Sequence, residues 1–322
     1  MADEKPRILI VDNSEQDIAH LKTILQTLDC RTESVSSGQE AIQVTNQYPP
    51  NLILLSLQIS DMKGHEAAQL IRERRQNGII PILFLTDSVE ENGYARQFDG
   101  LEATDLLRKP YYPFELISRC KALLNLKKYE EELEVAGQVL QSLALAVEAR
   151  DPTTGNHCDR LFYRLSKMAD LLRLGTEVKD TLLKGAVLHD IGKVGVPDHI
   201  LLKEGPLTDR EWEVMRQHVI IGESLCRPLK FLYPVLPLIR HHHERFNGSG
   251  YPDALRGTDI PLVARVFQVC DVFDALTNPR AYKPAFSCEE SIHILRKETE
   301  KGFWDPAIVK IFFQMLAIET VS

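Results

Sequence analysis

The sequence predicts two domains, an α/β doubly wound domain followed by an all-α domain, joined by a long helix. Up to about residue 120, strand-length apolar runs alternate with amphipathic helical segments. After about residue 140 the strand-like runs give way to amphipathic helical segments. The 322 residues also exceed the size at which single cores usually stop growing, about 250 residues. We expect domains at residues 1–125 and 148–322, with a linker helix over residues 126–147.

The N-terminal domain contains the runs "RILIV", "LILLSL" and "PILFLT", separated by helical patterns such as "SEQDIAHLKTILQTL". Continuous apolar runs are typical of parallel strands that are covered on both faces. In such sheets, functional groups collect at the carboxyl ends of the strands. Those ends carry Asp12, Asn13, Ser56, Thr86 and Lys109.

The expected linker helix belongs to a longer helical pattern. Beyond Pro113, only Gly137 interrupts this pattern as far as Val147. Its apolar residues alternate at spacings of three and four, which is a heptad seam with charged neighbours. The seam consists of Leu126, Tyr129, Leu133, Ala136, Leu140, Leu143 and Val147. Two interpretations remain open: a connector helix that lies on its own domains, or a parallel two-helix contact in a homodimer.

The C-terminal domain contains patterns such as "RLFYRLSKMADLLRL", "DREWEVMRQHVIIGESLC" and "SCEESIHILRKETEKG". Some begin with Ser, Thr or Asp, which favour the N-termini of helices. We expect an all-α domain here.

Composition and charge exclude several classes of function. The net charge of −8 argues against binding of nucleic-acid polymers through a broad basic face. The longest apolar runs are strand-sized rather than membrane-spanning, and the start "MADEKPRILIVD" has no signal-peptide pattern. The six cysteines are scattered without a C-x-x-C pair, which suits a reducing compartment. We therefore expect a cytoplasmic protein without a membrane partner.

Metal-capable side chains recur along the helical domain. They are His157, His189, Asp190, His218, His242, His243 and Asp271. A lone histidine on an apolar helix is more often a hydrogen-bonded core residue than a ligand, but burying this many imidazoles and carboxylates is costly unless cations ligate them. Neighbouring helical residues diverge by about 100°, so His189 and Asp190 can serve one site only near a helix end or beside two ions. An aspartate that bridges two ions fits the second of these cases.

The N-terminal half resembles the response-regulator receiver family, a flavodoxin-like fold of two-component signalling, in "ILIVDNSEQD", "SDMKG" and "LLRKP". In that family an acidic pair and a phosphoacceptor aspartate hold magnesium, while a Thr or Ser and a Lys contact the phosphoryl group. The alignment puts Ser56 on the acceptor position and Asn13 on the second acid. We therefore expect a receiver fold without aspartyl phosphorylation. Asp61, the nearest remaining acid, lies five residues on, in the following loop.

The C-terminal half resembles the HD-GYP family of cyclic di-GMP phosphodiesterases in "HDIGK", "HHERFNGSGYP", "DVFDALTNPRAYKPA" and "FWDPAIV". The resemblance implies a first metal site of His157, His189, Asp190 and Asp271. It implies a second site of His218, His242 and His243 with Asp190 shared, and leaves His241 outside. Thr153 stands where trinuclear members carry glutamate, which favours two divalent ions. Iron or manganese is the family's usual occupant, and zinc also suits these ligands.

The same resemblance implies a reaction and a substrate. Paired cations lower the pKa of a bridging water and stabilise phosphoryl charge, so the metal-bridging hydroxide would open cyclic di-GMP to pGpG, with cleavage to GMP left open. Asp190 and Lys193 are the expected catalytic residues. Tyr251, Arg280, Lys283 and Lys193 are expected to bind the dinucleotide, with Tyr251 presented by a tight glycine turn, and Asp151 is expected to support a ligand or water.

Two alternatives to this function stay open. One is a non-catalytic sensor that binds a cyclic dinucleotide or partner protein around a structural metal site, and the other is a nucleotidase of mononucleotides. The second uses neither the "GYP" loop nor the Arg280 and Lys283 pair. In the receiver-like domain, the absent acceptor favours a role in dimerisation or in docking a signalling protein.

Overall fold

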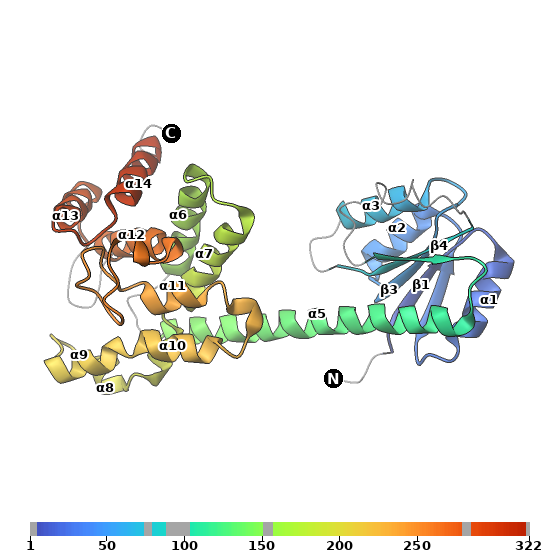
Figure 1. The fold of residues 1–322 in the computed structure, drawn as a ribbon, viewed down its shortest axis with the longest axis horizontal. Coiled ribbons are helices and arrows are strands. Elements are labelled where there is room, and N and C mark those ends of the chain that lie inside the picture. The colour runs from blue at the N-terminus through green and yellow to red at the C-terminus, as the bar shows by residue number, and fades with distance from the viewer. Residues whose placement is uncertain (1–4, 74–78, 88–103, 151–156, 279–284, 320–322) are drawn as a thin grey trace. The chain divides into compact units, whose positions relative to one another are not determined.

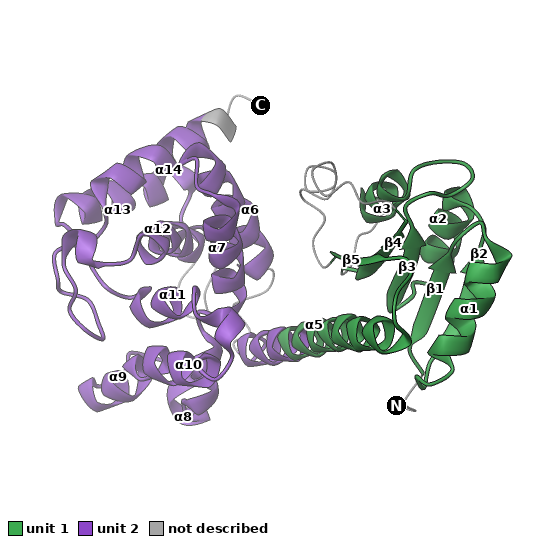
Figure 2. Cartoon of the chain, turned by 45° about the vertical axis from the view of Figure 1, so that its right-hand side comes forward, with its two compact units in different colours: residues 1–137 green, residues 138–322 purple. Residues whose placement is uncertain are grey.

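The structure is a computed structural model that describes residues 5–73, 79–87, 104–150, 157–278 and 285–319. Its contacts divide the chain into two compact units, residues 1–137 and 138–322 (Figure 2). The first unit is an α/β domain and the second is helical, so the predicted fold classes are confirmed.

The first unit is built on a parallel five-stranded sheet in the order β2-β1-β3-β4-β5 (Figure 1). Its strands are β1 (Arg7–Val11), β2 (Arg31–Val35), β3 (Leu52–Ser56), β4 (Ile82–Thr86) and β5 (Thr104–Arg108). The central strands β3 and β4 are buried along their whole length, as their continuous apolar runs predict. The edge strand β2 has mostly exposed residues, and its sequence "RTESV" carries little apolar signal.

Helices cover both faces of this sheet. They are α1 (Glu15–Leu25), α2 (Gly38–Gln47), α3 (Gly64–Glu73) and the first turns of α5 (Pro113–Glu148). Side chains alternate along a strand, so Ile8 and Ile10 pack in the apolar cluster that contains α1 and α5, whereas Leu9 and Val11 pack in the cluster that contains α2 and α3. The strands β1, β3 and β4 therefore each supply two cores, which explains why their sequences are apolar without alternation.

Helix α5 is one continuous helix of 36 residues. It begins as the last helix of the receiver-like unit and runs through the expected linker without a break, so Gly137 is accommodated inside it. The seam residues Leu126, Tyr129, Leu133 and Leu143 are exposed, while Val147 at its end is buried. The expected long connecting helix is confirmed.

The second unit consists of helices around a large apolar core and a smaller apolar cluster. They are α6 (His157–Leu171), α7 (Thr176–Leu188), η1 (Ile191–Gly195), α8 (Asp198–Leu201), α9 (Asp209–Arg216), α10 (His218–Cys226), η2 (Lys230–Leu232), α11 (Leu236–His241), η3 (Gly257–Asp259), α12 (Leu262–Thr277), α13 (Cys288–Glu300) and α14 (Pro306–Glu319). Phe267 and Phe273 of α12 are buried in this core. Capping boxes at Thr208 and Ser287 begin α9 and α13, as the sequence predicts.

One predicted helix is divided. The pattern "DREWEVMRQHVIIGESLC" forms α9 and α10, which meet at Gln217. This break places His218 at the first position of α10. Among the described residues, the longest apolar helical stretches are too short or too charged to cross a membrane.

Candidate metal centre

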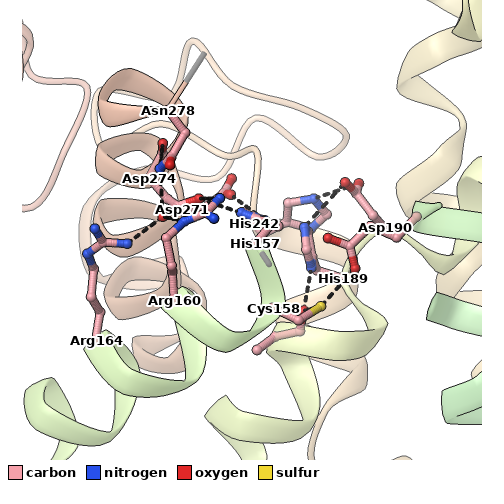
Figure 3. A network of polar contacts seen from close by, with 12 residues as sticks. His157, Cys158, Arg160, Arg164, His189, Asp190, His242, Asp271, Asp274 and Asn278 are labelled. Carbon is pink, nitrogen blue, oxygen red and sulfur yellow. Dashed lines mark hydrogen bonds and ion pairs between the residues drawn. The ribbon is translucent and has the colours of Figure 1, made fainter. Parts of the chain in front are cut away.

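The metal-capable side chains predicted from the sequence converge in two groups. One comprises His157, His189 and Asp271, and the other comprises Asp190, His218, His242 and His243. Within each group the candidate ligand atoms all lie within 4.8 Å of one another. Figure 3 shows that side chains from α6, α12 and the end of α7 meet here. The seven predicted residues are thus far apart in the sequence but lie close together in the folded domain.

Helix ends explain why adjacent residues can serve this centre. Helix α7 ends at Leu188, His189 is its C-cap, and the chain turns into η1 at Ile191. His189 and Asp190 therefore lie at the helix end that the sequence argument requires. Gly192 lets η1 approach α10, because a Cβ at this position would lie 1.8 Å from the carbonyl oxygen of His218.

The carboxylate of Asp190 faces both groups. Its Oδ2 lies 3.3 Å from His189 Nε2, and its Oδ1 lies 3.4 Å from His218 Nε2 and 4.0 Å from His242 Nε2. One oxygen thus points toward each set of imidazoles, which is the arrangement of a bridging carboxylate. The structure groups Asp190 with His218, His242 and His243, and the sequence assigned it to both sites.

Backbone carbonyls hold three of the imidazoles in one orientation. The Nδ1 atoms of His189, His218 and His242 lie 3.2, 2.7 and 2.9 Å from the carbonyl oxygens of Ala186, Met215 and Ile239. A carbonyl can only accept a hydrogen bond, so each Nδ1 carries the proton. Each Nε2 therefore turns its lone pair toward the centre of the cluster, as a metal ligand requires.

Unsatisfied polar atoms at the centre fit a cation. Asp190 Oδ1, His218 Nε2 and His242 Nε2 are buried and have no hydrogen-bond partner among the described residues. Burying such atoms unpaired is costly, and an ion would ligate all three. Imidazole and carboxylate donors are suitable ligands for divalent transition metals. The cluster can therefore hold a metal.

Burial keeps most of these imidazoles in the neutral form that a metal binds. It lowers the pKa of His243 to about 3, and it also lowers the pKa values of His242 and His218. The ring of Phe267, 4.9 Å from that of His189, supplies part of the apolar wall. His157 differs. Burial alone would lower its pKa, but hydrogen bonds to Asp271 and Asp274 raise it to about 10.

Asp274 is a site residue that the sequence analysis missed. Its Oδ2 lies 2.7 Å from Nδ1 of His157, and Arg160 and Arg164 also bind its carboxylate (Figure 3). It lies three residues after Asp271 in "DVFDALT", which places both carboxylates on neighbouring positions of one face of α12. That spacing was the signal available in the sequence.

Two predicted functional residues lie beside the cluster. Lys193 Nζ is 2.6 Å from Asp190 Oδ2. The ring of Tyr251 stacks on the imidazole of His243, with centroids 4.9 Å apart and planes 28° apart, and the guanidinium of Arg216 lies 5.2 Å from its centroid. We expected a ring presented rather than buried. The ring is half-buried, because one of the candidate ligands packs against it.

The loop that carries Tyr251 is tied to the same helix end as His242 and His243. The buried Glu244 carboxylate accepts hydrogen bonds from the backbone nitrogens of Asp253 and Leu255, at 2.7 and 3.1 Å. A Cβ at Gly250 would lie 2.2 Å from the backbone nitrogen of Arg245, so only glycine permits this close return. Arg240 and His241, the last two residues of α11, both bind the Asp253 side chain.

His241 stands apart from the cluster, as the sequence predicts. Its Nδ1 lies 3.0 Å from the carbonyl oxygen of Pro237 and its Nε2 lies 3.0 Å from Asp253 Oδ2. Four further residues singled out from the sequence, Asp151, Thr153, Arg280 and Lys283, lie outside the described residues.

The strand ends of the receiver-like unit hold a closed polar network. Lys109 Nζ lies 3.0 Å from Asp12 Oδ2 and 2.5 Å from Asp17 Oδ2. Ser56 is buried at the end of β3 and donates a hydrogen bond to the carbonyl oxygen of Gln58. Asp61 accepts from the backbone nitrogens of Gly38 and Gln39, so it caps α2. Asp12, Asp17 and Asp61 are therefore all bound to other groups of this unit.

Family models match both parts of the chain. A response regulator receiver domain matches residues 8–121, and an HD domain matches residues 141–308. Together with the curated relatives described next, these matches show that the chain belongs to the HD-GYP phosphodiesterase family that carries a receiver domain. This confirms the resemblance that the sequence motifs indicate.

Two curated relatives resemble the chain over nearly its whole length, and a third resembles part of it. A probable cyclic di-GMP phosphodiesterase of Vibrio cholerae is 36% identical over 95% of this chain and 76% of its own length. The cyclic di-GMP phosphodiesterase response regulator RpfG of Xanthomonas campestris is 33% identical over 96% of this chain and 87% of its own. A 3'3'-cGAMP-specific phosphodiesterase of Vibrio cholerae is 38% identical over 56% of this chain and 35% of its own.

Proposed function

We propose that this phosphodiesterase hydrolyses cyclic di-GMP, with linear pGpG as its first product. The observation that carries the proposal is the set of buried atoms Asp190 Oδ1, His218 Nε2 and His242 Nε2, which face one another across the cluster without a hydrogen-bond partner in the described part of the chain. The two relatives that resemble the whole chain, named as cyclic di-GMP phosphodiesterases, support the choice of substrate. Cleavage of pGpG to GMP would be a second turnover at the same centre.

Two divalent ions would occupy the centre. His157, His189 and Asp271 would hold one, His218, His242 and His243 the other, and Asp190 would serve both. When bound, such ions supply Lewis acidity, which lowers the pKa of a ligated water and offsets charge on the phosphoryl oxygens. We assign iron or manganese, because the mixed imidazole and carboxylate set suits them, with zinc as the further candidate.

The side chains around the cluster would bind and orient the dinucleotide. Lys193, already paired with Asp190, brings a cation next to the reacting phosphodiester. Tyr251 offers a ring held by His243 on which guanine can stack. Arg280 and Lys283 would bind the phosphates, and Asp151 would support a ligand or water.

The test is hydrolysis by purified protein loaded in turn with Fe(II), Mn(II) and Zn(II). Cyclic di-GMP and 3'3'-cGAMP are supplied separately and the products are resolved by chromatography. We expect pGpG from cyclic di-GMP with iron or manganese, and none from the His189→Ala, Asp190→Ala double variant. Faster turnover of 3'3'-cGAMP would reassign the substrate, and no product with any metal would refute the function.

We also propose a homodimer through α5. The seam residues Leu126, Tyr129, Leu133 and Leu143 are exposed at heptad spacing, and a second copy of the same helix is the complementary surface for such a pattern. The receiver-like unit would then serve as a docking module for a signalling protein rather than as a phosphorylated switch, since Ser56 replaces the acceptor.

A further inference from the structure

Among the imidazoles held through Nδ1, His157 has a different partner. His189, His218 and His242 each contact a backbone carbonyl three residues earlier through Nδ1. His157 is the first residue of α6, and the residues directly before it lie outside the described part of the chain. A carboxylate takes that place, because Asp274 Oδ2 lies 2.7 Å from its Nδ1.

The carboxylate of Asp274 is itself rigidly held. It is 1% exposed, and Arg160 donates to both of its oxygens at 2.8 and 2.9 Å. Arg164 and Asn278 bind its Oδ1 as well. Two guanidinium groups keep this carboxylate ionised and fixed in place, so the hydrogen bond that it accepts fixes the ring of His157.

Helix α12 thereby controls both sides of one imidazole. Asp271 Oδ1 lies 3.4 Å from Nε2 of His157, while Asp274, one turn further along α12, contacts Nδ1. Asp271 and Asp274 both lie on α12. The distance between these two contacts of His157 is therefore set by a helix rather than by a loop.

We propose that Asp274 is a positioning residue of the first metal site. It fixes the tautomer of His157 with the proton on Nδ1, points Nε2 at the ion, and raises the donor strength of the imidazole above that of the three carbonyl-bound histidines. This inference rests on the metal centre of the proposed function. It predicts that the two ions respond differently to loss of one carboxylate.

The competing explanation is that Asp274 only joins α6 to α12 through its arginines. The chain offers a matched control in Asp305, which is 7% exposed, lies in the same helical unit, and is bound by Arg265 of α12 at 2.6 Å. Asp305 is absent from both ligand groups. Asp274→Asn and Asp305→Asn therefore each remove one buried, arginine-paired charge, but only the first contacts a candidate ligand.

The test titrates each metal-free protein with Mn(II) in competition with a fluorescent chelator and records stoichiometry and affinity. We expect Asp274→Asn to weaken one of two ions by about 10- to 100-fold and to leave the other unchanged. Asp305→Asn should bind both ions like the wild type, although both variants lose thermal stability. Equal affinities in the wild type and Asp274→Asn, or equal weakening in both variants, would overturn the proposal.

A second measurement needs no variant. In wild-type protein labelled with ¹⁵N-histidine and loaded with Zn(II), NMR should find His157 protonated on Nδ1, with this proton further downfield than those of the carbonyl-bound histidines. Metal on Nδ1 of His157 would overturn the proposal. Wild-type protein that binds no metal would refute the proposed function too, whereas two ions bound without hydrolysis would refute only the function.

Discussion

The ammonium of Lys193 lies 2.6 Å from Asp190 Oδ2, the oxygen that also faces His189 Nε2 at 3.3 Å. A fixed cation is thus placed against the carboxylate that joins the two ligand groups. The pKa of Asp190 lies well below its usual value, because Lys193 and His189 outweigh the opposing effect of burial. The lowered pKa favours the ionised form of Asp190, and Lys193 is close enough to contact a substrate held beside it.

Replacing Lys193 separates substrate charge stabilisation from metal binding. We expect Lys193→Met to retain its metal ions, because the ligands are unchanged, and to lose about 10²- to 10³-fold in kcat, as expected when one charge-stabilising donor is removed. Lys184→Met is the matched control, since Lys184 pairs with Asp180 on the exposed side of α7. Metal content and steady-state kinetics check both variants, and unchanged kcat in Lys193→Met would contradict the role.

Adjacent histidines in "HHH" give a second prediction. His242 is a candidate ligand, whereas His241 bonds to Asp253 outside the cluster. We expect His242→Ala to lose bound metal and to hydrolyse at least about 10²-fold more slowly, because a metal contributes several kcal/mol to such reactions. His241→Ala should keep its bound metal and its rate of hydrolysis. Metal analysis and activity measure the difference, and equal losses in the two variants would contradict the assignment.

The sequence predicted which metal-capable side chains converge better than it predicted their surroundings. The histidines and aspartates recur in sequence motifs, so the seven candidate ligands between His157 and Asp271 could be named before the fold was known. Asp274 was not named, although its spacing from Asp271 is visible in the sequence, because its contact with His157 depends on how α6 packs against α12. The edge strand β2 was also missed, since exposed residues carry no apolar run. The half-burial of Tyr251 follows from stacking on His243, a contact that no spacing encodes.

The proposed homodimer gives a third prediction. Leu133 and Val135 are 53% and 58% exposed on α5, but only Leu133 belongs to the heptad seam. We expect Leu133→Glu to convert the dimer to a monomer, because a charge at a core position of a coiled coil is poorly tolerated, while Val135→Glu remains dimeric. Light scattering after size-exclusion chromatography measures the mass, and a monomeric wild type would end the proposal.

The receiver-like unit gives a fourth prediction. Acetyl phosphate and beryllofluoride should change neither activity nor oligomeric state, because Ser56 cannot form an acyl phosphate and Lys109 is bound to Asp12 and Asp17. Restoring two acids in Asn13→Asp, Ser56→Asp is the positive control, which should gain magnesium binding by titration. Phosphate incorporation into the wild type would show that another residue accepts it.

The Asp253 network gives a pH prediction. Hydrogen bonds from Arg240 and His241 lower the pKa of Asp253 from its usual 3.8 to about 2, despite some burial. A depressed pKa contributes stability that is present above pH 4 and is lost as the pH falls toward 2. Asp253→Asn should therefore cost about 0.5 to 1 kcal/mol at pH 7, since the group is a third exposed, and less at pH 3. Urea unfolding of both proteins at several pH values measures the difference.

The end of α5 has a mechanical consequence for the centre. Ala144 of α5 packs in one apolar cluster with Leu188 and Ile191, the residues that flank His189 and Asp190. Close-packed interiors transmit displacement instead of absorbing it. A twist or axial slide of this last stretch of α5 would therefore act directly on the residues that flank His189 and Asp190, and so on the spacing between the two ligand groups.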